Sequence, residues 1–171
     1  MLNRFVISME KLEKNLEHFD VQTGIVIGVC ATIVMDLWLV IANRLFGFDK
    51  PNWRPVGRWV VECMHGRVIH DDISLARSYA YENQVGWSFH YAVGAVYGLF
   101  FLYLISVNWI DLPLIISALL FGWFTISAGW FFLHPCIGLG IALNKTANPQ
   151  FGRLVGLIAH TAFGLGLPLL I

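Results

Sequence analysis

Three ionisable residues stand inside long apolar runs of this 171-residue sequence, where a charge is costly. They are Asp36 in the run between Gln22 and Arg44, His90 in the run between Gln84 and Asn108, and His160 in the run from Leu154 to Ile171. An unpaired charge within a membrane helix costs about 3 kcal/mol or more, so such residues usually face a bundle interior and indicate a functional site.

The three residues lie at similar depths from one boundary of their runs. Asp36 precedes Arg44 by eight residues, His90 follows Gln84 by six, and His160 follows Arg153 by seven. At 1.5 Å per helical residue, we expect all three about 9 to 12 Å inside the same face of the membrane. Thr32, one helical turn before Asp36, completes this predicted intramembrane polar layer.

One carboxylate and two imidazoles in a layer leave several chemistries open. Asp36, His90 and His160 are candidate ligands for a divalent transition metal with open positions, as used to activate water or oxygen. The same groups can pass a proton, because histidine titrates near neutral pH and a carboxylate holds a neighbouring imidazole in one tautomer. The third interpretation is a structural network that only fixes the helix register.

Polar residues in the first and third loops form a candidate mouth for this layer. They are Arg58, His70, Asp71, Asn148 and Arg153, and His134 at the end of the third run stands near them. His65, His70, Asp71 and Asp72 are also metal-ligand types within one loop, although scattered His and Asp in a loop are more often simply solvated.

The composition excludes several classes of protein. Hydrophobic residues make up 57% of the chain and charged residues 13%, whereas a soluble domain carries about 25% charged residues. The net charge of zero gives no basic field for nucleic acids. Three cysteines without a CxxC pair predict neither a disulfide framework nor a zinc ribbon. We therefore predict an integral membrane protein.

Four apolar runs are long enough to span the bilayer. The predicted spans are residues 23–43, 85–107, 112–133 and 154–171, within one domain of residues 21–171 that follows a tail of residues 1–20. They should be helices, because an open strand would leave its backbone groups unpaired in lipid. The predicted fold class is an all-α membrane protein with four transmembrane helices.

The first loop should carry an amphipathic helix on the cytoplasmic surface. Its apolar residues Val56, Trp59, Val60, Cys63 and Met64 fall at helical spacing, while Arg58 and Glu62 face elsewhere.

Basic residues predict the orientation. Three Lys or Arg residues precede the first span, and eight lie in or beside the first and third loops. The positive-inside rule therefore puts both loops in the cytoplasm and both termini outside.

Small residues recur every fourth position on the spans that carry the ionisable residues. The three ridges are Gly24, Gly28, Thr32 and Asp36; Gly86, His90, Gly94 and Gly98; and Gly152, Gly156, His160, Gly164 and Pro168. Small residues at this spacing let membrane helices approach closely. Each ionisable residue is therefore expected on the packed side of its own helix.

Taken together, the motifs resemble a bacterial inner-membrane family catalogued as domain of unknown function 2938. The residues that carry the resemblance include Met35-Asp36, Val56-Gly57-Arg58-Trp59, His70-Asp71, Gly86-Trp87, His90-Tyr91, Asn148-Pro149, Arg153, His160 and Phe163-Gly164. The sequence departs from the usual pattern at Ala147 and His134, which weakens His134 as a ligand. The resemblance implies a multi-pass inner-membrane protein and brings no activity with it.

The sequence thus predicts a protein that handles a proton or small solute at the Asp36, His90 and His160 layer, in the bilayer and as a homodimer or within a larger complex. Two alternatives stay open. One is a metal-dependent membrane enzyme acting on a lipid or quinone, and the other is an accessory subunit of a membrane complex.

Overall fold

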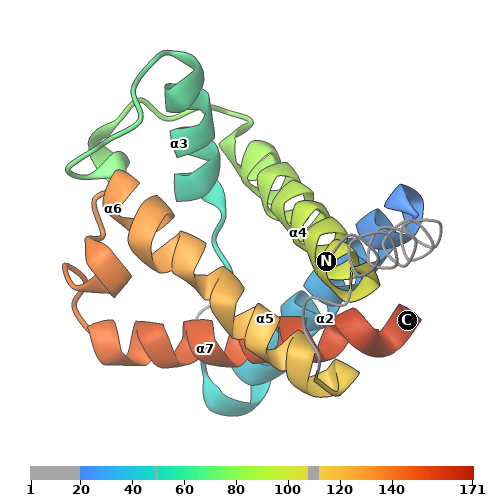
Figure 1. Cartoon of the computed structure of the whole chain (residues 1–171). Helices are drawn as coiled ribbons and strands as arrows, with labels where there is room; N and C mark the ends of the chain where they lie inside the picture. Colours follow the sequence, from blue (N-terminus) through green and yellow to red (C-terminus); the bar gives the residue numbers. More distant parts are fainter. Residues whose placement is uncertain (1–19, 49, 108–111) are drawn as a thin grey trace, which may run out of the picture.

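The computed structural model describes residues 20–48, 50–107 and 112–171, and within these residues the chain is helical with no strand. Four helices are long and apolar enough to cross a membrane (Figure 1). They are α2 (Val21–Phe46), α4 (Glu82–Ser106), the stretch Leu114–Cys136 that begins as α5 (Leu114–Ala128), and the stretch Pro149–Leu170 that begins as α7 (Pro149–Gly166). The predicted fold class is confirmed. The predicted tail lies outside the described residues, apart from Asp20.

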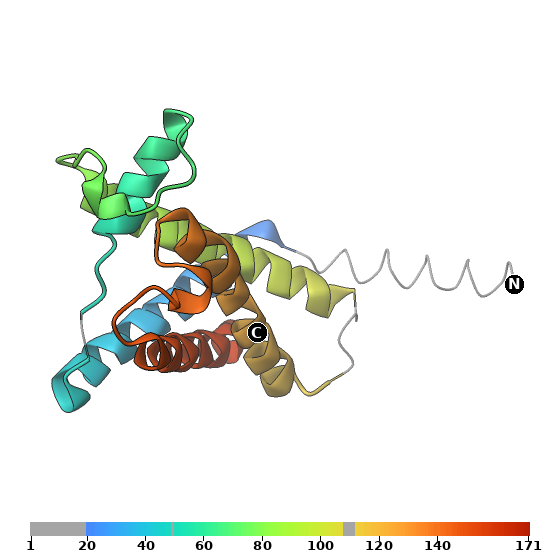
Figure 2. The ribbon, with the colours of Figure 1, turned by 90° about the vertical axis from the view of Figure 1, so that its left-hand side faces the viewer.

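Shorter elements connect these helices. Helix α3 (Arg54–Met64) and the 3-10 turn η1 (Ile73–Leu75) lie between α2 and α4. The third span continues from α5 through the π-helix η2 (Gly129–Leu133) into α6 (His134–Cys136), and η3 (Ile141–Leu143) leads to α7, which ends in η4 (Leu167–Leu170). Figure 2 shows α3 and its flanking loops gathered at one end of the molecule.

The four spans pack as a chain of neighbours rather than as a closed ring. Helix α4 packs against α2, α2 against α7, and α7 against α5, whereas α4 and α5 touch each other at few positions. Figure 1 shows α4 and α5 diverging, with α3 near the wide end between them. The rings of Tyr97, Phe100 and Phe101 on α4 contact Phe121 on α5, so the two helices are separated only toward the end where α3 lies.

Local sequence explains where the helices begin and end. The Asp20 carboxylate accepts hydrogen bonds from the backbone N–H groups of Gln22 and Thr23 and caps α2, which ends at Gly47 in the left-handed conformation with φ of 71°. Asn148 caps helix α7, since its side chain accepts from Phe151 N–H, and the helix begins at Pro149.

The small-residue ridges bring α2 and α4 into backbone contact. A Cβ atom on Gly28 would lie 2.1 Å from the Gly94 carbonyl oxygen, and one on Gly98 would lie 2.3 Å from Gly28 nitrogen. Larger residues cannot fit between the two helices here. This contact brings the helical turn of α2 that carries Asp36 next to the turn of α4 that carries His90.

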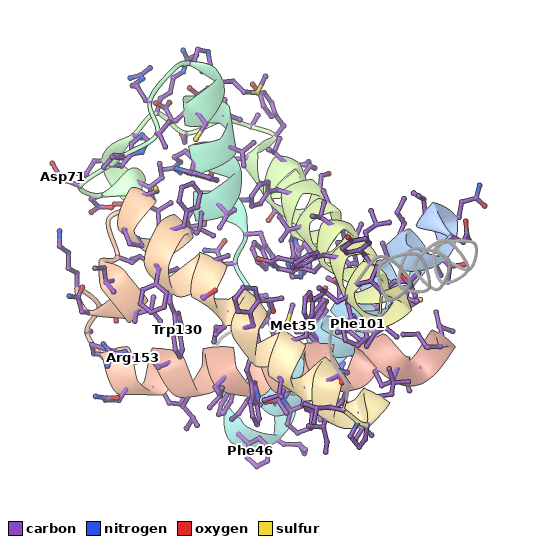
Figure 3. All side chains as sticks on the ribbon, in the orientation of Figure 1. Met35, Phe46, Asp71, Phe101, Trp130 and Arg153 are labelled. Carbon is purple, nitrogen blue, oxygen red and sulfur yellow. The ribbon has the colours of Figure 1, made fainter. Side chains whose placement is uncertain are left out.

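The main core lies where α2, α4, α5 and α7 meet. Its fully buried members include Ile27, Ala31, Phe101, Ala118 and Leu167. Figure 3 shows Met35 and Phe101 within the body of the molecule, whereas Asp71 lies at its outer edge.

Helix α3 packs differently from the prediction. Its Gly57 lies against α4, where a Cβ atom would be 1.7 Å from the Glu82 carbonyl oxygen. Glu62, expected to face away, is 1% exposed, and Met64, expected on the apolar face, is 82% exposed. The reason is that partners from the following loop pair with the polar face, so α3 buries part of that face within the protein.

Candidate functional site

Asp36 and His90 form a hydrogen-bonded pair across the α2–α4 contact. The Asp36 Oδ1 atom lies 3.2 Å from His90 Nε2, and the Tyr91 hydroxyl donates to Asp36 Oδ2 at 2.9 Å. Both side chains of the pair are largely buried. Two donors thus satisfy the carboxylate, and the imidazole is held by one of its two nitrogens.

Trp53 covers the face of the His90 ring. The two rings stack with centroids 4.0 Å apart and planes inclined by 22°. Trp53 directly precedes α3, and its backbone carbonyl lies close to Gly86, where a Cβ atom would be 2.0 Å away. Gly86 therefore gives this loop room to approach α4 and bring Trp53 to His90.

His160 is held separately, between α7 and α5. Its Nδ1 atom lies 2.9 Å from Thr125 Oγ1 and 3.2 Å from the Gly122 carbonyl oxygen. The small residue Gly122 permits this approach, since a Cβ atom there would lie 2.6 Å from the His160 carbonyl oxygen. The hydrogen bonds of Asp36 and His160 therefore belong to two different helix pairs.

A cavity of about 300 Å³ joins the two pairs. Its polar lining is small and comprises Thr32, His90, Thr125 and His160, with the Tyr97 hydroxyl and the Trp53 indole. Its remaining lining is Met35, Trp59, Phe89, Val93, Gly94, Ala128, Gly129, Phe132, Leu133 and Phe163. A mostly apolar pocket with a few convergent polar groups is the usual form of a small-molecule site.

The π-helix η2 forms part of this cavity wall. Gly129, Phe132 and Leu133 line the cavity from η2, and Ala128 lines it from the end of α5. A π-helix inserts an extra residue into a helical turn and is often found at functional sites. Here it changes the direction of the side chains that follow α5.

The five predicted mouth residues mostly hold the loops together. Arg58 donates from Nε and Nη2 to the Glu82 carboxylate at 2.9 and 3.0 Å, and from Nη1 to carbonyls of the η1 segment. Arg153 donates to the Ala142 carbonyl oxygen at 2.8 Å, and Asn148 caps α7. Figure 3 shows Arg153 and Asp71 on separate parts of the molecule.

His70 lies in a second polar cluster around Glu62. Glu62 accepts a hydrogen bond from the Tyr79 hydroxyl at 2.7 Å, pairs with Arg67 at 3.0 Å, and lies 3.8 Å from His70 Nε2. The Tyr79 hydroxyl, and with it the charges of Arg67 and His70, lower the pKa of Glu62 against the opposing effect of burial. This cluster ties the loop to α3 and lies outside the cavity lining.

Within the described ranges, no three His, Cys, Asp or Glu side chains come together as a metal site. The predicted ligand set of Asp36, His90 and His160 is divided, since Thr125 and Gly122 engage the Nδ1 atom of His160.

Sequence reasoning missed Tyr91, Trp53 and Thr125 as partners of the site. Tyr91 directly follows His90, and neighbouring residues on a helix point about 100° apart. Helical spacing therefore does not predict that both side chains contact Asp36. Trp53 has a sequence signal in hindsight, because it is a large aromatic residue in an otherwise polar segment between Pro51 and Pro55.

A family model described as protein of unknown function (DUF2938) matches residues 25–170. The match includes α2 from Ile25 onward, the other three membrane helices and every residue of the cavity lining. No curated protein and no solved structure matches the chain.

Proposed function

The chain belongs to the family of proteins of unknown function DUF2938, and from its geometry we propose that it binds a small, largely apolar molecule within the membrane and exchanges a proton with it at His90. The observation that supports this proposal is a single imidazole placed between a carboxylate and an apolar cavity.

The Asp36–His90 pair suits the exchange of one proton. An ionised Asp36 accepts a hydrogen from His90 Nε2, so a neutral imidazole carries its lone pair on Nδ1. When Nδ1 takes a proton, the imidazolium charge is paired with Asp36. Hydrolase triads use a carboxylate in the same way, to orient a histidine base and stabilise its charged form.

The walls of the cavity favour this chemistry. Trp53 and the other aromatic residues exclude water from the imidazole, and charges interact more strongly where the dielectric constant is low. A ligand proton would therefore move between two groups rather than into bulk water.

The test uses 4-nitrophenol, a small aromatic acid that absorbs visible light strongly only when it is ionised. The protein in lipid nanodiscs is titrated with the probe at a pH where the free probe is mostly neutral, and protein-free nanodiscs provide the blank. We expect a saturable band of bound nitrophenolate, about one per chain, because His90 takes the proton. Asp36→Asn should still bind the probe but lose the band.

Two tryptophan substitutions test whether the cavity is the binding site. Ala128→Trp fills the cavity from its rim and should abolish binding. Leu120→Trp lies on the same helix at a position that is 46% exposed and outside the cavity lining, so it should leave binding unchanged. An absent band in the unmodified protein, or an equal band in Asp36→Asn, would contradict the proposal.

We further propose that the protein lies in a bacterial inner membrane with α3 and the loop before α7 in the cytoplasm. Support comes from the eight basic residues in or beside these two loops, against three before α2. A green fluorescent protein fused after Ile171 should stay dark after export by the secretory machinery, whereas alkaline phosphatase at the same point should be active. The opposite pair of results would reverse the orientation.

A further inference from the structure

We infer that the ligand is a lipid-soluble ring with two hydroxyl groups, the chemistry of a quinol, and that it enters from the bilayer between α4 and α5. This inference rests on the proposed function, because it assigns a ligand class to the same cavity. It follows from the hydrogen-bonding state of the cavity, the nature of its walls and the position of its opening.

The hydrogen atoms around His160 can be assigned from its partners. The Thr125 hydroxyl donates its single hydrogen to the Gly122 carbonyl oxygen at 2.6 Å, so its oxygen is left as an acceptor. Both atoms near His160 Nδ1 are then acceptors, and Nδ1 must carry the hydrogen. The neutral ring therefore has its lone pair on Nε2.

The same reasoning gives His90 a lone pair on Nδ1, because Asp36 takes the hydrogen on Nε2. Thr32 also donates its hydroxyl hydrogen within the protein, to the Gly28 carbonyl oxygen at 2.8 Å. The cavity thus presents two imidazole acceptors, from α4 and from α7, beside the Tyr97 hydroxyl and the unpaired indole N–H of Trp53, which can donate to a ligand oxygen. A ligand that supplies two hydroxyl donors satisfies both nitrogens, and one of these protons is the proton that His90 accepts.

The size and the walls of the cavity favour a planar ring. Six aromatic side chains line it, namely Trp53, Trp59, Phe89, Tyr97, Phe132 and Phe163. Aromatic rings pack well on one another in stacked and edge-on arrangements. A volume of about 300 Å³ is at the small end for ligand sites, so a ring fits and a long chain attached to it does not.

The opening of the cavity lies on the lipid side. Among its lining residues, Ala128 and Phe132 are exposed, Phe132 by 56%. Two ring contacts bound the gap between α4 and α5 here, since Trp59 contacts both Phe89 and Phe132, and Phe121 contacts Tyr97. Across the gap, Phe89, Val93 and Tyr97 form a half-buried row on α4. These rims are apolar apart from the Tyr97 hydroxyl, so a ring can enter from the hydrocarbon region while its chain stays in lipid.

The probes are a benzoquinol with a ten-carbon alkyl chain, kept reduced with ascorbate, and its dimethyl ether, which has the same ring and chain without donors. Binding is followed by ¹⁹F NMR of protein labelled with 5-fluorotryptophan in nanodiscs. The Trp53 signal, assigned with Trp53→Phe, reports the cavity, and the exposed Trp123 reports general partition into lipid.

We expect saturable binding of the quinol about tenfold tighter than of the ether, the effect of one or two hydrogen bonds to buried acceptors. His160→Phe keeps a ring and removes the acceptor. It should weaken the binding of the quinol and leave the binding of the ether unchanged. His65→Gln, in a loop outside the cavity lining, serves as the control and should change neither.

Equal affinities of the quinol and the ether in the unmodified protein would overturn the inference, whether or not His160→Phe folds. A loss of both probes in a folded His160→Phe protein would also overturn it, since the residue would then act by shape alone. The 4-nitrophenol titration separates the two proposals. If the protein ionises 4-nitrophenol but binds the quinol and the ether equally, the proposed function stands and only the ligand class is wrong. If 4-nitrophenol is not ionised, the proposed function itself is refuted.

Discussion

Trp53 contributes to the site through its ring rather than through a hydrogen bond. Its indole Nε1 is buried without a partner among the described residues, while its face stacks on His90. A hydrogen bond requires a donor and an acceptor and so leaves a trace in the residue types, whereas a stacking contact depends only on shape and position. This is one reason why the sequence did not identify it.

Replacement of Trp53 should therefore weaken ligand binding according to how much of the ring is lost. We expect Trp53→Ala to weaken 4-nitrophenol binding by about tenfold, since aromatic pairs contribute about 0.5 to 1.5 kcal/mol beyond the area they bury. Trp53→Phe, which keeps a smaller ring, should lose less of this affinity. Titration in nanodiscs measures both, and equal affinities for all three proteins would show that the stack plays no part.

Glu62 makes the loop that follows α3 sensitive to acid. Because its partners lower its pKa in the folded protein, its stabilising contribution is full above the ordinary value of 4.5 and is lost as the pH falls below it. The protection of the amides of residues 67–79 against hydrogen exchange, relative to the intrinsic rate at each pH, should fall below about pH 4.5. In Glu62→Gln this protection should already be lower at pH 7 and should depend less on pH.

The exposed Asp71 in the same loop provides the control for that measurement. Asp71→Asn should preserve both the slow exchange at pH 7 and its acid dependence. If Glu62→Gln behaves like Asp71→Asn, the cluster around Glu62 does not hold the loop.

At the scale of elements, the small-residue ridges were the most informative part of the sequence. They predicted which faces of α2 and α4 pack, and the structure shows Gly28 against Gly94 and Gly98. The contact between Asp36 and His90 follows from that packing. The position of His160 against Thr125 does not, because the ridge of α7 packs on α5 and spacing alone does not predict the order of the helices around the bundle.

The spacing of residues in the sequence also did not predict the π-helix η2 or the packing of α3. A π-helix depends on the surroundings that hold one extra residue in a turn, and the residues Gly129–Leu133 have ordinary helical composition. For α3, the apolar pattern predicted a helix correctly, but a pattern alone does not distinguish a lipid surface from a protein surface. Glu62 is buried by its contacts with Arg67, His70 and Tyr79, which lie further along the loop and which the spacing within α3 does not indicate.

The close contact of α2 and α4 makes Gly28 sensitive to the smallest substitution. Gly28→Ala would place a methyl group 2.1 Å from the Gly94 carbonyl oxygen and force the helices apart. We expect a loss of about 1 to 3 kcal/mol in the free energy of unfolding, measured by steric trapping in bicelles. Gly129→Ala is the matched control, because its Cβ would meet only the His134 ring at 3.9 Å.

At the scale of the whole molecule, the outer surface is largely apolar while its ends are polar. Leu120 and Phe124 are exposed on α5, and Asp71 is exposed in the first loop. Composition predicted the four spans because lipid requires long apolar helices, whatever their packing. The divergence of α4 and α5 toward the α3 end was not predictable, since it is a property of the arrangement and of no single helix.

A spin label should therefore report lipid at one set of positions and water at another. Labels are attached to cysteines at Leu120, Phe124 and Asp71 in a protein whose Cys30, Cys63 and Cys136 are replaced by alanine. Oxygen, which concentrates in lipid, should relax the first two labels strongly, and a water-soluble nickel chelate should relax the third. Water exposure at Leu120 would contradict the membrane placement of α5.

The claim that His90 accepts a proton from a ligand in the cavity is tested most directly by ¹⁵N NMR of histidine-labelled protein in nanodiscs, with the His90 signals assigned by His90→Gln. Without ligand at neutral pH, we predict a neutral ring with its hydrogen on Nε2, the nitrogen that faces Asp36. With saturating 4-nitrophenol, both ring nitrogens should carry hydrogen in the unmodified protein, and this change should be absent in Asp36→Asn. If the probe saturates the cavity and the His90 ring stays neutral, the proton exchange proposed for this site does not occur.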